Sequence, residues 1–64
     1  MDKTYSVGTF THPGAELEMV DGTLTFEEAV KLGEVLLQNH FGVEVVDNDP
    51  NNMEPIVWCN CNEF

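Results

Sequence analysis

Two segments near the N-terminus alternate between apolar and polar residues, which is the pattern of a half-buried β-strand. The first covers residues 3–10, and the second covers residues 16–20, where glutamates alternate with apolar side chains. Thr11-His12-Pro13-Gly14 between them and Asp21-Gly22 after them are typical turn sequences. The pattern predicts two strands joined by a hairpin loop, with charged residues outward and apolar residues inward.

Apolar residues then recur at spacings of three and four, which predicts a helix of about four turns. Thr25 and Glu28 have the spacing of a capping box at its start. Gly33 lies within the apolar face and lowers helix propensity by about 1 kcal/mol relative to alanine, so we expect close packing on a sheet there. The apolar face is expected to extend to His40, and Gly42 to end the helix in the left-handed conformation.

Two further apolar runs follow the helix, at residues 43–46 and 56–59, and both are predicted to be strands. Residues 47–52 are rich in aspartate and asparagine, which favours a loop, and the tail from residue 60 is expected to be frayed. The predicted fold is α+β with the order ββαββ: a four-stranded, mainly antiparallel sheet with one helix packed on one face. Residues 1–64 are expected to form a single domain.

One helix covers only one face of such a sheet. The second face is therefore expected to be wet, covered by the tail or used for self-association. The residues expected to line it are Phe10, Val46, Val57 and Cys59.

The charge of the chain bears on what this surface can bind. The sequence has twelve acidic residues and only two lysines, so the formal net charge is −10. Most carboxylates cannot be neutralised within the chain, so the surface potential is expected to be negative. Nucleic acid and anionic membranes are excluded as direct partners. A chain of 64 residues also has a thin core, which disulfides, metals or oligomerisation usually supplement.

The sequence has no secretory signal pattern and no apolar run of about 18 residues, so we expect a cytoplasmic protein. Cys59 and Cys61 are separated by one residue. On the expectation that a strand directs them to opposite faces, they are predicted to be reduced thiols rather than a disulfide pair.

Candidate chemistry is sparse. Residues 47–52 begin like a calcium loop, but Asn52 replaces the turn glycine and Trp58 replaces the closing glutamate. Cys59 and Cys61 with the two histidines would supply a zinc ligand set, although their spacing is unlike that of zinc motifs. No nucleophile can be paired with a base, and no glycine loop for phosphate is present. We therefore predict no metal site, no cofactor and no enzymatic activity.

The acidic residues remain the candidate site, since the net charge exceeds the magnitude of about 2–8 that solubility requires. Glu16 and Glu18 are expected to project from one strand face, about 6.8 Å apart, as part of an array that resembles a polyanion. The predicted partner-binding residues are Glu16, Glu18, Glu27, Glu34, Glu44, Asp47 and Asp49.

In size, acidity and lack of enzymatic motifs, the chain resembles the small inhibitors of phages and mobile elements, such as anti-CRISPR proteins and DNA mimics. Residues 23–29 with residues 42–45 are also similar to the strand, helix and strand of a small phage inhibitor of bacterial RNA polymerase. The resemblance implies an inhibitor that occupies the basic nucleic-acid-binding surface of a bacterial protein. The alternative hypothesis is a small housekeeping or structural domain that self-associates, as a homodimer for example, and whose acidity serves solubility only.

Overall fold

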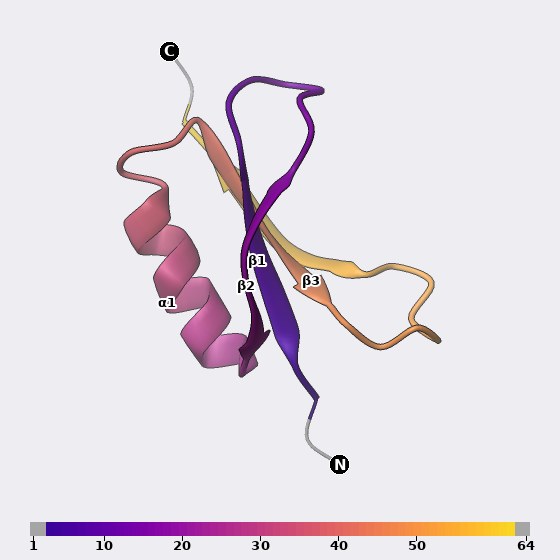
Figure 1. Ribbon diagram of the computed structural model, residues 1–64. Helices are drawn as coiled ribbons and strands as arrows, with labels where there is room; N and C mark the ends of the chain where they lie inside the picture. Colours follow the sequence, from indigo (N-terminus) through magenta and orange to yellow (C-terminus); the bar gives the residue numbers. More distant parts are fainter. Residues whose placement is uncertain (1–2, 63–64) are drawn as a thin grey trace.

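Four strands and one helix make up the fold, in the predicted order. The computed structural model describes residues 3–62, and Figure 1 shows the helix along one side of the sheet. The elements are β1 (Tyr5–Phe10), β2 (Glu18–Leu24), α1 (Phe26–Leu36), β3 (Gly42–Asp47) and β4 (Ile56–Cys61). The predicted α+β class and ββαββ order are confirmed.

The strands form one open antiparallel sheet in the order β2-β1-β3-β4. β1 and β3 are therefore central, and β2 and β4 are the edges. Because β2 and β3 both run antiparallel to β1, they are parallel to each other, and parallel strands need a crossover connection. α1 is that connection, which is why it lies across one face of the sheet. Within residues 3–62, no helix is long and apolar enough to span a membrane.

α1 begins at the predicted capping box. The backbone N–H of Glu28 donates to Thr25 Oγ1 at 3.2 Å, and the backbone N–H of Thr25 donates to Glu28 Oε1 at 3.0 Å. Each bond satisfies an N–H that has no partner within the helix. The predicted start of the helix is therefore confirmed.

The end of α1 differs from the prediction, because side chains satisfy its last carbonyls. His40 Nδ1 lies 2.8 Å from Leu36 O, and Asn62 Nδ2 donates to Leu37 O at 2.7 Å and to His40 O at 3.0 Å. The helix stops at Leu36, so the predicted extension to His40 is wrong. Gly42 is the first residue of β3 and has no positive φ, so its predicted role as a left-handed cap is also wrong.

The hydrophobic core lies between α1 and the sheet. Val7 of β1, Ala29 of α1 and Val45 of β3 are fully buried and pack together. A Cβ added at Gly33 would lie only 2.9 Å from Cζ3 of Trp58 on β4. The predicted close packing of the helix at Gly33 is confirmed, and an indole ring fills the space that the missing side chain leaves.

The face away from α1 is covered by side chains that lie over glycines. The Leu17 side chain occupies the space that a Cβ at Gly8 would need, and the Phe10 ring does the same at Gly42. Phe10 also makes an edge-to-face contact with Phe41, with the ring centroids 5.8 Å apart. Phe10 therefore lies on the second face, as predicted, and glycine allows this face to be covered without a second helix.

Strand register places the other residues predicted for the second face. Val45 pairs with Trp58 beneath α1, so Val46 and Cys59, each one position further along its strand, face the opposite side. Both are therefore on the second face, as predicted. Val57 has no partner in the register, because it lies at an irregularity between Val45 and Val46.

β2 runs through the predicted turn at Asp21-Gly22. The strand begins at Glu18 and continues to Leu24, with register shifts against β1. Asp21 Oδ1 accepts hydrogen bonds from the backbone N–H and the hydroxyl of Thr23 at 3.1 and 3.2 Å. The turn prediction is wrong, because Asp21 and Gly22 lie within an irregular edge strand, and the hydrogen bonds between Asp21 and Thr23 form there.

The C-terminal part of the chain is more ordered than the sequence predicts. β4 continues to Cys61, and the backbone N–H of Asn62 donates to Phe41 O at 2.7 Å. The predicted frayed tail is therefore wrong for residues 60–62. Residues 63 and 64 of that tail lie outside the described residues.

The Gly33–Trp58 contact leads to a stability prediction. Gly33→Ala should destabilise the fold by about 1–3 kcal/mol, because overpacking a filled core outweighs the gain of about 1 kcal/mol in helix propensity. Val35→Ala is the control, since Val35 is 59% exposed on the same helix, and it should change stability by less than about 0.5 kcal/mol. Urea unfolding would measure both, and a Gly33→Ala protein as stable as the parent would contradict the packing account.

Candidate functional site

The predicted partner-binding carboxylates are distributed over several elements of the fold. Glu16, Glu18, Glu27 and Glu34 are exposed, Glu44 and Asp49 are half-buried, and Asp47 is buried. They belong to the β1–β2 connection, β2, α1, β3 and the β3–β4 loop. The tertiary structure therefore does not gather them into one cluster.

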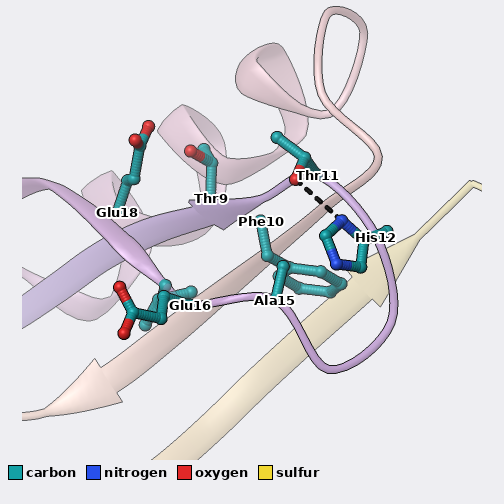
Figure 2. A pocket seen from close by; sticks show the side chains of 8 residues that line it. Thr9, Phe10, Thr11, His12, Ala15, Glu16 and Glu18 are labelled. Atoms are coloured by element: carbon teal, nitrogen blue, oxygen red, sulfur yellow. Dashed lines mark hydrogen bonds between the residues drawn. The ribbon is translucent and has the colours of Figure 1, made fainter.

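Glu16 and Glu18 do not form the predicted pair on one strand face. Glu18 is the first residue of β2, whereas Glu16 precedes the strand. Figure 2 shows that Glu18 points to the same side as Thr9, its partner on β1, and that Glu16 points to the opposite side. Because a strand is needed to hold alternate side chains on one face, the expected pairing is wrong.

The two glutamates instead border a hollow of about 410 Å³ beside the β1–β2 connection (Figure 2). The connection contains the predicted turn, in which the Ala15 N–H donates to His12 O at 3.0 Å and Gly14 has φ 83°. Pro13 before a glycine of positive φ is the pattern of a type II turn. The residues lining the hollow are Thr9, Phe10, Thr11, His12, Ala15, Glu16, Leu17 and Glu18.

This hollow lacks the arrangement that nucleophilic catalysis needs. Thr11 Oγ1 lies 3.1 Å from His12 Nδ1, but both residues are exposed. No carboxylate among residues 3–62 forms an ion pair with His12. A base without a group to orient it and without a desolvated pocket does not activate a hydroxyl. The polar groups that line the hollow are carboxylates, hydroxyls and one imidazole.

The carboxylates of Glu27 and Glu34 on α1 form no ion pair. Both are exposed, as is Lys31, but no ion pair joins Glu27 to Lys31. Within the part of the chain that the structure describes, the ion pair present is that of Lys3 with Asp47, at 3.5 Å. The negative charge is therefore directed to solvent rather than neutralised within the fold.

Asp47 is the exception, because its carboxylate organises the β3–β4 loop. Oδ1 accepts the backbone N–H of Asp49 at 3.0 Å, and Oδ2 accepts the Asn52 side chain at 2.9 Å. These two hydrogen bonds, the one from the Asp49 N–H first, hold the pKa of Asp47 below its ordinary value, and the charge of Lys3 lowers it to a smaller extent. Asp47 thus serves the fold, and its carboxylate is not available to a partner.

The same loop shows why the resemblance to a calcium site does not extend to its geometry. Asp49 Oδ1 accepts the backbone N–H of Asn51 at 2.9 Å, and Asn52 Oδ1 accepts that of Glu54 at 2.9 Å. The oxygens bind successive amides along the loop instead of converging on one point. Among residues 3–62, no three histidine, cysteine, aspartate or glutamate side chains come together in a metal-binding group.

Asn48 has a structural role that the sequence did not reveal. Its Nδ2 donates to Thr4 Oγ1 at 3.1 Å and to Gly22 O at 3.0 Å, and its Oδ1 accepts the Ser6 hydroxyl at 2.6 Å. One side chain therefore joins β3 to β1 and β2. In the sequence, the only sign of this role was an asparagine directly after a predicted strand. A turn explains an asparagine at that position equally well.

The two cysteines are free and exposed. Both belong to β4, where Cys59 pairs with Glu44 and Cys61 pairs with Gly42. Residues two apart in a strand share a face, so the expectation that these thiols point to opposite faces is wrong. They lie side by side on the edge strand.

The bonding of Asp47 leads to a pH prediction. A carboxyl whose pKa is lowered by folding stabilises the protein above the unfolded value, about 3.9, and loses that contribution as pH falls through the folded value. Asp47→Asn should therefore be less stable than the parent near neutral pH, with the difference shrinking below about pH 4. Thermal unfolding between pH 7 and pH 3 would measure it, with Glu54→Gln as an exposed control. A pH-independent difference would contradict the account.

Comparison of the chain with protein-family models, with curated proteins and with solved structures finds no significant match.

Proposed function

We propose that this chain is an acidic interaction protein that occupies the basic nucleic-acid-binding surface of a bacterial protein in the cytoplasm, as an inhibitor of the phage counter-defence or host-takeover type. The observation that carries the proposal is that most of the carboxylates among residues 3–62 are exposed, and that these residues form almost no internal ion pairs. A charge that the fold does not use is available to a partner of opposite sign.

The charge density fits a nucleic-acid substitute. The molecule measures 40 × 21 × 15 Å, so ten net negative charges along the longest axis give about one charge per 4 Å. Duplex DNA carries one charge per about 1.7 Å of axis, and one of its strands carries one per about 3.4 Å. The charge spacing is therefore closer to that of a single strand than to that of a duplex, which favours a partner whose basic surface normally binds a single strand.

The exposed carboxylates would mainly raise the rate of association with the partner. Long-range attraction raises the rate of encounter, and salt screens this attraction within about 10 Å at 0.1 M. Glu16 and Glu18 lie beside the hollow, and Glu27 and Glu34 lie on α1. Because these four are exposed and form no ion pair, they are the most available to a basic surface among the seven predicted partner-binding residues. Glu44 and Asp49 are half-buried and would contribute less.

Affinity capture from a bacterial lysate tests this proposal. The tagged protein should retain a nucleic-acid-binding protein at about 0.1 M salt and lose most of it at about 0.5 M, where the screening length is about half as long. An added single-stranded oligonucleotide should displace the partner, because both compete for one groove. Recovery of the bait alone, or a partner indifferent to oligonucleotide, would contradict the proposal.

Charge variants identify the surface. With the captured partner in purified form, replacing Glu16, Glu18, Glu27 and Glu34 by lysine should lower the association rate constant at least about tenfold at low salt. Replacing the same residues by glutamine is the matched control and should give a smaller loss. Stopped-flow binding would measure both, and equal rates for the parent and the lysine variant would exclude these four residues as contacts.

A further inference from the structure

The two edges of the sheet differ in how well they are protected. β2 contains Glu18 and Asp21 and has register shifts against β1. Charges and bulges are the devices that keep an exposed edge from pairing with another strand. β4, with the sequence Ile-Val-Trp-Cys-Asn-Cys, contains no charged residue in a chain of net charge −10. β4 is therefore the edge that another strand can approach.

The hydrogen bonds of β4 indicate which backbone groups face that edge. The N–H of Asn62 donates to Phe41 O, and bonded pairs alternate with non-bonded pairs in an antiparallel ladder. Asn60 and Trp58 thus bond to β3, and the backbone groups of Cys59 and Cys61 point outward. Asn60 Oδ1 accepts the Cys61 N–H at 2.9 Å, so Cys59 retains both an unpaired donor and an unpaired acceptor.

Apolar surface accompanies this free edge. Ile56 is 54% exposed and Val57 is 39% exposed, and Met53 in the adjoining loop is 95% exposed. A second chain on β4 would remove part of this apolar surface from water.

We propose that β4 pairs antiparallel with β4 of a second copy, so that two sheets join into one continuous eight-stranded sheet around a two-fold axis at Cys59. Each Cys59 N–H would then donate to the C=O of the other Cys59. A second copy suits this edge because β4 carries no charge, so two chains of net charge −10 place no like charges directly opposite each other there. The adjoining carboxylate, Glu44 of β3 beside Cys59, is half-buried. A second copy also supplies apolar cover to a core with only four fully buried apolar residues among residues 3–62.

This interface differs from self-association through the uncovered sheet face. Leu17 and Phe10 already lie across that face, over Gly8 and Gly42. The β4 edge is a separate surface from the glutamates of the proposed inhibitory function. The two proposals also have opposite salt dependence, because screening weakens attraction to a basic partner but reduces repulsion between two acidic copies.

Sedimentation from about 10 µM to about 1 mM tests the dimer, which mass action makes concentration-dependent. We expect a monomer–dimer equilibrium that shifts toward dimer as salt rises from about 0.1 to about 0.5 M. A monomer at every concentration, or a dimer weakened by salt, would overturn the proposal. The glutamine and lysine variants of the four glutamates should still dimerise, so failure of either proposal leaves the other testable.

Variants at Cys59 locate the interface. Cys59→Pro removes the outward N–H without breaking a bond to β3, and proline is tolerated on an edge strand in this orientation. It should raise the dimer dissociation constant at least about tenfold, which corresponds to about 1.4 kcal/mol. Cys59→Ser keeps the N–H and is the control. Cys59→Asp, which places two like charges opposite each other, gives the same test if the proline variant does not fold. Unchanged dimerisation in a folded Pro or Asp variant would overturn the proposal.

Oxidation provides a direct readout. Directly bonded antiparallel residues have Cα atoms about 5.5 Å apart, which is within disulfide range. Diamide should therefore link two Cys59 residues, each thiol giving up one proton and one electron as diamide is reduced to the hydrazine. We expect Cys61→Ser to form the covalent dimer and Cys59→Ser to form it much more slowly. Equal cross-linking of the two variants would place the contact elsewhere.

Discussion

The contact between Gly33 of α1 and Trp58 of β4 sets the distance between the helix and the sheet. A short chain with one helix must cover a four-stranded sheet on both faces, and the fold depends on bringing large side chains against backbone. Gly8 and Gly42 allow the same close approach on the other face, to Leu17 and Phe10. Dense packing against backbone thus compensates for the small number of apolar side chains.

Asparagine side chains hydrogen-bond to backbone groups and hydroxyls at the ends of the short helix and strands. Asn62 binds carbonyls at the end of α1, and Asn48 joins three strands at one end of the sheet. Asp21, Glu28 and Asp49 accept hydrogen bonds only from residues two or three positions away, and Asp47 is the acidic residue that also contacts a distant segment. Side-chain hydrogen bonds between distant segments are therefore made mostly by neutral amides, and most of the charge faces solvent. This separation is what makes a strongly acidic surface compatible with so small a core.

The two proposed interactions follow from the same separation. Carboxylates at the surface favour attraction to a basic groove, whereas the uncharged β4 strand is the place where two like-charged copies can meet. If both proposals hold, the dimer would present two acidic surfaces on one continuous sheet. Such an arrangement raises the effective concentration of the second surface once the first has bound.

The sequence alone determined the element order, the N-cap of α1 at Thr25 and the close packing at Gly33. Hydrophobic periodicity, capping and the low helix propensity of glycine are all local properties of the chain. It also fixed the negative charge. Only the tertiary structure decided that α1 ends at Leu36, that Asp21 lies within a strand and that Asp47 is buried. Each involves partners distant in the chain, such as Asn62 for the helix end, Val7 for Asp21 and Lys3 for Asp47. Hydrogen bonds between distant segments leave no periodic trace in a sequence, and they overrode the local preferences that the predictions used.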